Sequence, residues 1–106
     1  MGDYTLVFDE VILNQLKKLE KDKHTKEIVS KILDKIEEYG PNAGRLLDSR
    51  LKIYEVKRKH PPIRLYYKII ESTKEAHVFE YEMKTSQQKQ SQIIEKIKQK
   101  SEELKS

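Results

Sequence analysis

The sequence predicts an α+β protein in which a helical hairpin packs on one face of a mainly antiparallel four-stranded sheet. Two observations lead to this class. Segments 51–57, 62–70 and 76–84 alternate apolar and polar residues with the period of two that is typical of strands. Segments 10–21 and 25–39 place apolar residues three and four positions apart, as on one face of a helix. Because helices and strands fall in separate runs, we expect the strands to pair with one another and the helices to cover them.

Length and composition limit the possible functions. The 106 residues are enough for one compact domain, which we place at residues 1–106. Charged residues make up 38% of the chain and hydrophobic residues 36%, which predicts a thin core under a heavily charged surface. The net charge of +4 is compatible with a nucleic acid or an acidic partner without choosing between them.

Two absences in the sequence indicate the cellular compartment that we expect for this protein. The chain has no cysteine, which excludes disulfides and thiolate chemistry and favours the reducing cytoplasm. No apolar run is long enough to span a membrane, so we expect no membrane partner.

The first half of the chain is expected to supply one strand and two helices. A strand is predicted at Tyr4–Phe8, and Asp9 can cap a helix over residues 10–21. Thr25 is expected to cap the second helix, which carries a clean apolar stripe. Gly40 and the proline after it end this helix, because glycine accepts a positive φ and proline cannot continue the helix.

The second half is expected to supply a loop, three strands and a last helix. Residues 42–50 are predicted to form the loop, with Arg45 and Arg50 as exposed candidates for phosphate contact. The three alternating segments follow as strands. Thr85 or Ser86 is expected to cap a last helix, which has a narrow apolar stripe and is predicted to pack loosely. The predicted element order is therefore β-α-α-β-β-β-α.

Strand parity divides the side chains between two faces of the sheet. One set, which includes Val56, Leu65, Tyr67, Phe79 and Tyr81, is apolar and is expected to face the helices. The other set is charged and is expected to share an open face; it includes Glu55, Lys57, Arg64, Tyr66 and Lys84. A face that gathers cations, an acid and a phenol, close to the basic run 57–60, predicts a surface that binds a polyanion and carries groups suited to cutting it.

Several segments resemble the RelE/ParE superfamily of bacterial and archaeal toxin–antitoxin pairs, and most closely its HigB-like branch. They are 53–56 (Ile-Tyr-Glu-Val), 63–67 (Ile-Arg-Leu-Tyr-Tyr), 83–89 (Met-Lys-Thr-Ser-Gln-Gln-Lys) and the connection 39–47. Their order and spacing cover nearly the whole chain. The resemblance implies a RelE-like fold and a toxin that enters the ribosomal A site and cleaves mRNA. It also implies a cognate antitoxin protein as partner.

The resemblance implies a site on the open face of the sheet. Such enzymes use the ribose 2′-OH as nucleophile, so neither a metal nor a small-molecule cofactor is implied. Arg64 matches the family's phosphate-binding arginine, and a cross-strand salt bridge with Glu55 or Glu82 is the alternative. Lys57 would stabilise charge or act as a base, unless it is only an exposed sheet lysine. Glu55 would act as a general base or orient Arg64.

The remaining predicted site residues have less defined roles. Lys84 would bind phosphate or the leaving group, and Tyr66 would stack on a base or transfer a proton. The residues expected to contact RNA are Lys52, Arg58, Lys59, His60, Lys68 and Lys89. The spacing of the histidines does not suggest a metal site.

Two other functions remain open at this stage. The superfamily also contains toxins directed at gyrase, and a RelE-like chain can be a binding module without catalysis. The first alternative predicts DNA damage in place of cut mRNA, and the second predicts no growth arrest.

Overall fold

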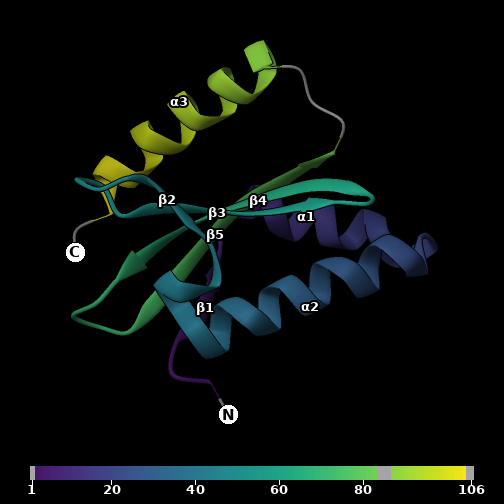
Figure 1. Cartoon of the computed structure of the whole chain (residues 1–106), viewed down its shortest axis with the longest axis horizontal. Helices are drawn as coiled ribbons and strands as arrows, with labels where there is room; N and C mark the ends of the chain where they lie inside the picture. The colour runs from purple at the N-terminus through teal and green to yellow at the C-terminus, as the bar shows by residue number, and fades with distance from the viewer. Residues whose placement is uncertain (1, 84–86, 105–106) are drawn as a thin grey trace.

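The computed structural model describes residues 2–83 and 87–104, and its sheet carries helices on both faces (Figure 1). In chain order the elements are β1 (Thr5–Phe8), α1 (Glu10–Lys18), η1 (Leu19–Lys21), α2 (Lys23–Tyr39), η2 (Gly40–Ala43), β2 (Arg45–Asp48), β3 (Ile53–Lys59), β4 (Pro62–Ile70), β5 (Glu75–Met83) and α3 (Gln87–Glu103). The five strands lie in the order β1-β5-β4-β3-β2. β1 runs parallel to β5, and the other pairs are antiparallel. The α+β class is confirmed.

The predicted count of four strands is wrong, because residues 45–48 form the edge strand β2 and not a loop. Arg45 lies opposite Glu55 and Leu46 opposite Tyr54 on β3. Four residues are too few for an alternating pattern to stand out. This segment is a strand because it forms backbone hydrogen bonds with β3. Gly44, just before β2, lies so close to the backbone of Glu55 that a Cβ at this position would overlap it.

Local signals set the start of α1 and the end of α2 correctly, but not the start of α2. The predicted cap of the last helix at Thr85 or Ser86 lies outside the described residues. The Asp9 carboxylate accepts from the backbone N–H of Val11 at 3.0 Å and caps α1, as predicted. Thr25 does not cap α2; Asp22 does, accepting from the backbone N–H of Thr25 at 3.1 Å and from its hydroxyl at 2.7 Å. Gly40 ends α2 with a φ of +55°, and a Cβ there would also overlap the ring of Tyr4.

The main core lies between the helical hairpin of α1 and α2 and one face of the sheet. The stripe of α2, including Ile32 and Ile36, packs with Ile12 of α1 against Leu65 and Tyr67 of β4. Tyr67 stacks on Tyr54 with ring centroids 5.4 Å apart, and its hydroxyl donates to the carbonyl of Gly40 at 2.9 Å. The prediction that the hairpin covers one face of the sheet is confirmed.

The last helix lies on the opposite face, and this overturns the prediction that all helices share one side (Figure 1). Ile97 of α3 is fully buried in a second core with Leu51, Ile53, Tyr66 and Phe79. Among the described residues of α3, Ile97 and Ser101 are buried and Ile93 and Ile94 are only partly buried, which agrees with the predicted loose packing. α3 covers part of the face that the sequence predicted to be open.

A β-bulge explains why Phe79 belongs to this second core. Tyr66 of β4 lies opposite Glu80 of β5, whereas Tyr67 lies opposite Val78, so Phe79 has no partner across the pair. The extra residue reverses the parity of the strand beyond it. Phe79 consequently faces α3, and its predicted place in the main core with Tyr81 is wrong. Tyr81 itself packs against the main core, as predicted.

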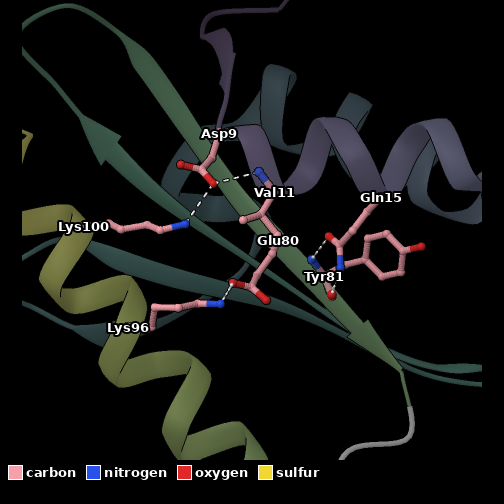
Figure 2. A network of polar contacts seen from close by, with 7 residues as sticks. All are labelled: Asp9, Val11, Gln15, Glu80, Tyr81, Lys96 and Lys100. Atoms are coloured by element: carbon pink, nitrogen blue, oxygen red, sulfur yellow. Dashed lines mark hydrogen bonds and ion pairs between the residues drawn. The ribbon is translucent and has the colours of Figure 1, made fainter.

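Ion pairs join α3 to the sheet and to neighbouring loops. Lys96 contacts Glu80 of β5 at 3.3 Å, and Lys100 contacts Asp9 at 3.0 Å (Figure 2). Lys98 contacts Asp48 at 3.6 Å, and Glu102 contacts Arg50 at 3.1 Å. Charged side chains of α3 therefore pair with elements that are distant in the chain.

A side chain of α1 completes the hydrogen bonding of β5 beyond the end of β1. The amide of Gln15 donates to the carbonyl of Tyr81 at 2.8 Å and accepts from the N–H of Tyr81 at 3.0 Å (Figure 2). β1 stops opposite Val78, so these groups of Tyr81 have no strand beside them on that edge. Within the described part of the chain, no helix is long and apolar enough to cross a membrane.

Candidate functional site

A hollow of about 220 Å³ opens at the end of the sheet where β3 and β4 meet. Its lining comes from β3, β4 and β5 and consists of Lys57, Arg58, Lys59, Pro62, Ile63, Arg64 and Glu82. The strand register builds it, because Lys57 lies opposite Arg64 and Arg64 lies opposite Glu82. Three adjacent strands therefore each place one charged side chain in a single row on the same face.

Arg64 is held in this row by Glu55. Its guanidinium contacts the Glu55 carboxylate at 3.3 Å, and the other oxygen of that carboxylate contacts Arg45 at 2.8 Å. The side chain of Glu55 is only 1% exposed, whereas that of Arg64 is 25% exposed. One buried carboxylate therefore fixes two arginines and leaves part of the Arg64 fork, which has five N–H donors, directed to other acceptors. The predicted alternative of a salt bridge with Glu55 and the predicted orienting role of Glu55 both agree with this geometry.

The prediction that Tyr66 lies on an open face of the sheet is wrong. Tyr66 is fully buried beneath α3, and its hydroxyl donates to a Glu82 oxygen at 2.5 Å. Burial first, and then the hydrogen bond to Glu82, raise the pKa of Tyr66 well above its usual value. A buried phenol that stays protonated cannot stack on a base at the surface, and its observed contact positions Glu82.

Glu82 is the acid in the hollow that sequence reasoning considered only as a partner for Arg64. It is buried, and its Oε2 atom has no hydrogen-bond partner among the described residues. Such orphaned buried acceptors are rare in folded proteins and call for a physical explanation. Strand alternation could have identified Glu82 as a site residue. It lies two positions after Glu80 and opposite Arg64, so both acids share the sheet face of Arg64 and Tyr66.

The other predicted residues divide between the hollow and the rest of the molecule. Arg58 and Lys59 are exposed on its rim, and His60 is exposed in the turn that follows. Lys52 is exposed at the opposite end of β3, where its carbonyl accepts from the N–H of Ile69. Lys89 lies exposed near the start of α3, and Lys84 lies outside the described residues.

The prediction that Lys68 contacts RNA is wrong. Lys68 is only 3% exposed, and its ammonium donates to the carbonyl of Leu51 at 2.7 Å. Burial lowers the pKa of Lys68, with Asp48 opposing the shift. A lysine held in this way serves the second core and does not reach a ligand at the surface.

Residues 2–83 and 87–104 contain no group of three or more His, Asp or Glu side chains placed to hold a metal ion. The side chains at the hollow are of the kind that can bind an anion. The hollow offers a partly exposed, pre-oriented guanidinium, three flanking cations and one buried carboxylate that accepts a hydrogen bond from a phenol.

The fold of this chain is similar to that of several solved toxin structures. The isolated RelE toxin of E. coli is 24% identical, with a TM-score of 0.65 over 89% of this chain and 98% of that one. RelE in the intact E. coli RelBE toxin–antitoxin complex is 25% identical, with a TM-score of 0.64 over 78% and 99%. The RelBE2 toxin–antitoxin complex of Mycobacterium tuberculosis gives 18% identity and a TM-score of 0.58 over 81% and 97%.

The chain therefore has the fold of the RelE toxins, and the resemblance to the RelE/ParE superfamily inferred from the sequence is confirmed at the level of the fold. The closer resemblance to the HigB-like branch stays a prediction. No protein-family model and no curated protein matches this chain.

Proposed function

We propose that this protein is the toxin of a toxin–antitoxin pair and that it cleaves mRNA on the ribosome. The single observation that carries the proposal is the hollow at Arg64, a pre-oriented anion site on a RelE fold. The structural neighbours are named as RelE toxins and as toxin–antitoxin complexes, which supports the toxin class.

The chemistry that fits this hollow is transfer of the phosphate to the adjacent ribose 2′-OH. Arg64 holds the scissile phosphate with the guanidinium donors that Glu55 leaves free, and this stabilises the negative charge that builds up on the phosphorane. The 2′-oxygen forms a bond to phosphorus while the bond to the 5′-oxygen breaks. The products are a 2′,3′-cyclic phosphate and a free 5′-hydroxyl.

Two proton transfers complete this step. Glu82 takes the proton of the 2′-OH, because it is the carboxylate that lines the hollow next to Arg64. Lys57 gives a proton to the departing 5′-oxygen, since it lines the same hollow opposite Arg64. Glu55 orients Arg64 and does not act as the base, because both of its oxygens are engaged by arginines.

Mapping mRNA ends in a translating extract tests the proposal. The wild-type protein should produce cuts in translated mRNA, and Arg64→Ala should reduce the rate by about 10²–10³-fold, as expected for loss of one transition-state contact. Lys21→Ala is the control, because Lys21 is an exposed cation that does not line the hollow. Intact mRNA in the extract would refute the proposal. In cells that express the protein, growth arrest with intact mRNA and broken DNA would favour a gyrase-directed toxin.

We also propose a cognate antitoxin protein as partner and the cytoplasm, where ribosomes translate, as the place of action. The complexes among the structural neighbours support the antitoxin. Where a small gene adjoins the gene of this protein, co-expression of the two should relieve growth arrest. If arrest persists while both proteins accumulate, that gene does not encode the antitoxin.

A further inference from the structure

A second cationic groove runs along the other side of β3, outside the hollow at Arg64. Two adjoining depressions form it. One, of about 320 Å³, is lined by Lys35, Ala43, Gly44, Arg45, Glu55, Val56 and Lys57. The other, of about 210 Å³, is lined by Lys31, Ile32, Lys35, Val56, Lys57 and Arg58. They share Lys35, Val56 and Lys57, so they form one continuous channel between α2 and β3, which we call the α2–β3 groove.

The walls of the α2–β3 groove come from regular structure. Lys31 and Lys35 are four residues apart on α2 and therefore project from the same side of the helix. Val56 and Arg58 alternate with Lys57 along β3, so they point toward the sheet face that α1 and α2 cover. Ile32 and Val56 are buried and form an apolar floor beneath the cations.

The charge of the α2–β3 groove is almost entirely positive. Five cations line it, and the acids nearby are already engaged. Glu55 is buried and paired with Arg45 and Arg64, and Glu27 makes an exposed pair with Lys31 at 3.5 Å that contributes little in water. Unlike the lysines of α3, the lysines on this side of α2 are not used to hold the fold together.

The groove and the hollow at Arg64 meet at β3. Lys57 and Arg58 line both, because β2 covers β3 only as far as Glu55 and leaves the rest of that edge uncovered. A polyanion can therefore pass from Arg64 over the edge at Lys57 and continue along α2. The groove lining contains no aromatic ring among the described residues, so it offers contacts to a backbone and no platform for base stacking.

We propose that the α2–β3 groove is a second binding site, which holds the phosphate backbone of the RNA strand beyond the nucleotides seated at Arg64, without preference for base sequence. This proposal rests on the function proposed above for its choice of RNA as the polyanion. It extends that function by giving the protein a footprint longer than the hollow. The continuity through Lys57 and Arg58 favours one RNA chain over an acidic protein segment as the occupant.

Binding of RNA of two lengths tests the proposal. The probes are fluorescent 2′-O-methyl oligonucleotides, which cannot be cut because the nucleophile is blocked, of about 4 and about 12 nucleotides. The double variant Lys31→Gln/Lys35→Gln removes two charges from the groove and none from the hollow. Lys17→Gln/Lys21→Gln is the matched control, because these lysines have the same spacing and are exposed on another part of the surface.

The groove variant should bind the long probe more weakly, and the slope of log K against log salt should fall by about 1.4, or about 0.7 for each lost phosphate contact. It should bind the short probe like the wild type, and the control should match the wild type with both probes. Circular dichroism verifies that both variants fold, and Lys31→Glu/Lys35→Glu should enlarge the effect on the long probe.

Three results would overturn the inference. They are wild-type affinity of the groove variant for the long probe, an equal loss for both probe lengths, and a preference of the groove for a glutamate-rich peptide over RNA of equal charge. The test is separable from that of the proposed function. Length-dependent binding without cleavage of mRNA supports the groove proposal and refutes the nuclease. Cleavage of mRNA without a length effect supports the nuclease and refutes the groove proposal.

Discussion

Replacing Tyr66 with phenylalanine separates a structural role of this residue from a catalytic one. The substitution removes the hydroxyl that donates to Glu82 at 2.5 Å and keeps the ring that packs with Phe79 and Ile97. Glu82 is buried and its second oxygen already lacks a partner, so the variant leaves the whole carboxylate without a hydrogen bond from the described residues.

The expected loss follows from this geometry. A hydrogen bond to a charged group contributes about 1.5–3 kcal/mol to the free energy of unfolding. Because the Glu82 carboxylate that loses its donor is buried, the loss should lie near the upper end of this range. For a domain of this size, a loss of about 2.5 kcal/mol lowers Tm by about 10 °C. Urea unfolding followed by circular dichroism measures the change. Tyr39→Phe is the control, because Tyr39 is 52% exposed and should change stability by less than about 0.5 kcal/mol.

A double-mutant cycle with Glu82→Gln assigns the loss to this pair. Under conditions where each variant is folded, Tyr66→Phe should lose less cleavage than Arg64→Ala, because the phenol acts only by positioning Glu82 and does not contact the phosphate. The reasoning fails if Tyr66→Phe is as stable as the wild type, or if the cycle shows no coupling. Loss of cleavage with full stability would instead make Tyr66 a catalytic residue.

Three further predictions follow from other contacts. Gln15→Ala should cost about 1–3 kcal/mol in urea unfolding, because it abandons both backbone groups of Tyr81, whereas exposed Gln99→Ala should have little effect. The hydrogen bond from the N–H of Leu51 lowers the pKa of Asp48, so its charge stabilises the fold above the unfolded value of about 4, and this benefit disappears as pH falls through the lower folded pKa. The stability difference between wild type and Asp48→Asn should therefore be largest near neutral pH and vanish in acid; a constant difference would contradict it. Burial raises the pKa of Tyr66 and Tyr67, so the stability they confer is complete below about pH 10 and is lost as pH rises through their folded values; their tyrosinate absorbance should appear only together with unfolding.

The sequence predicted the parts of this fold that depend on long, regular patterns. The stripe of α2 and the alternation of β3 and β4 extend over several turns or several pairs of residues, so burial of one face leaves a clear period. The same alternation placed Glu55, Lys57 and Arg64 on one side of the sheet. It also gave the two possibilities for Arg64, of which the salt bridge with Glu55 is present.

Features that depend on a single residue or on a distant partner were not predictable in this way. The strand at 45–48 exists because β3 offers an unpaired edge, and four residues carry too little pattern to reveal it. The bulge at Phe79 reverses parity, and a period-two argument cannot detect one extra residue from one strand alone. Lys68 looked like a surface cation, yet its ammonium is buried and donates a hydrogen bond to the carbonyl of Leu51 from another segment.

Taken alone, the order of residues determined the α+β class, the helical hairpin on one face and the row of charges around Arg64, because each follows from which side of a helix or strand avoids water. Only the tertiary structure decided that α3 covers the other face and buries Tyr66. The physical reason is that α3 buries Ile97 against side chains of β3, β4 and β5 and pairs its lysines with Glu80, Asp9 and Asp48. The strength of such pairs depends on distances across the fold, which no local pattern contains.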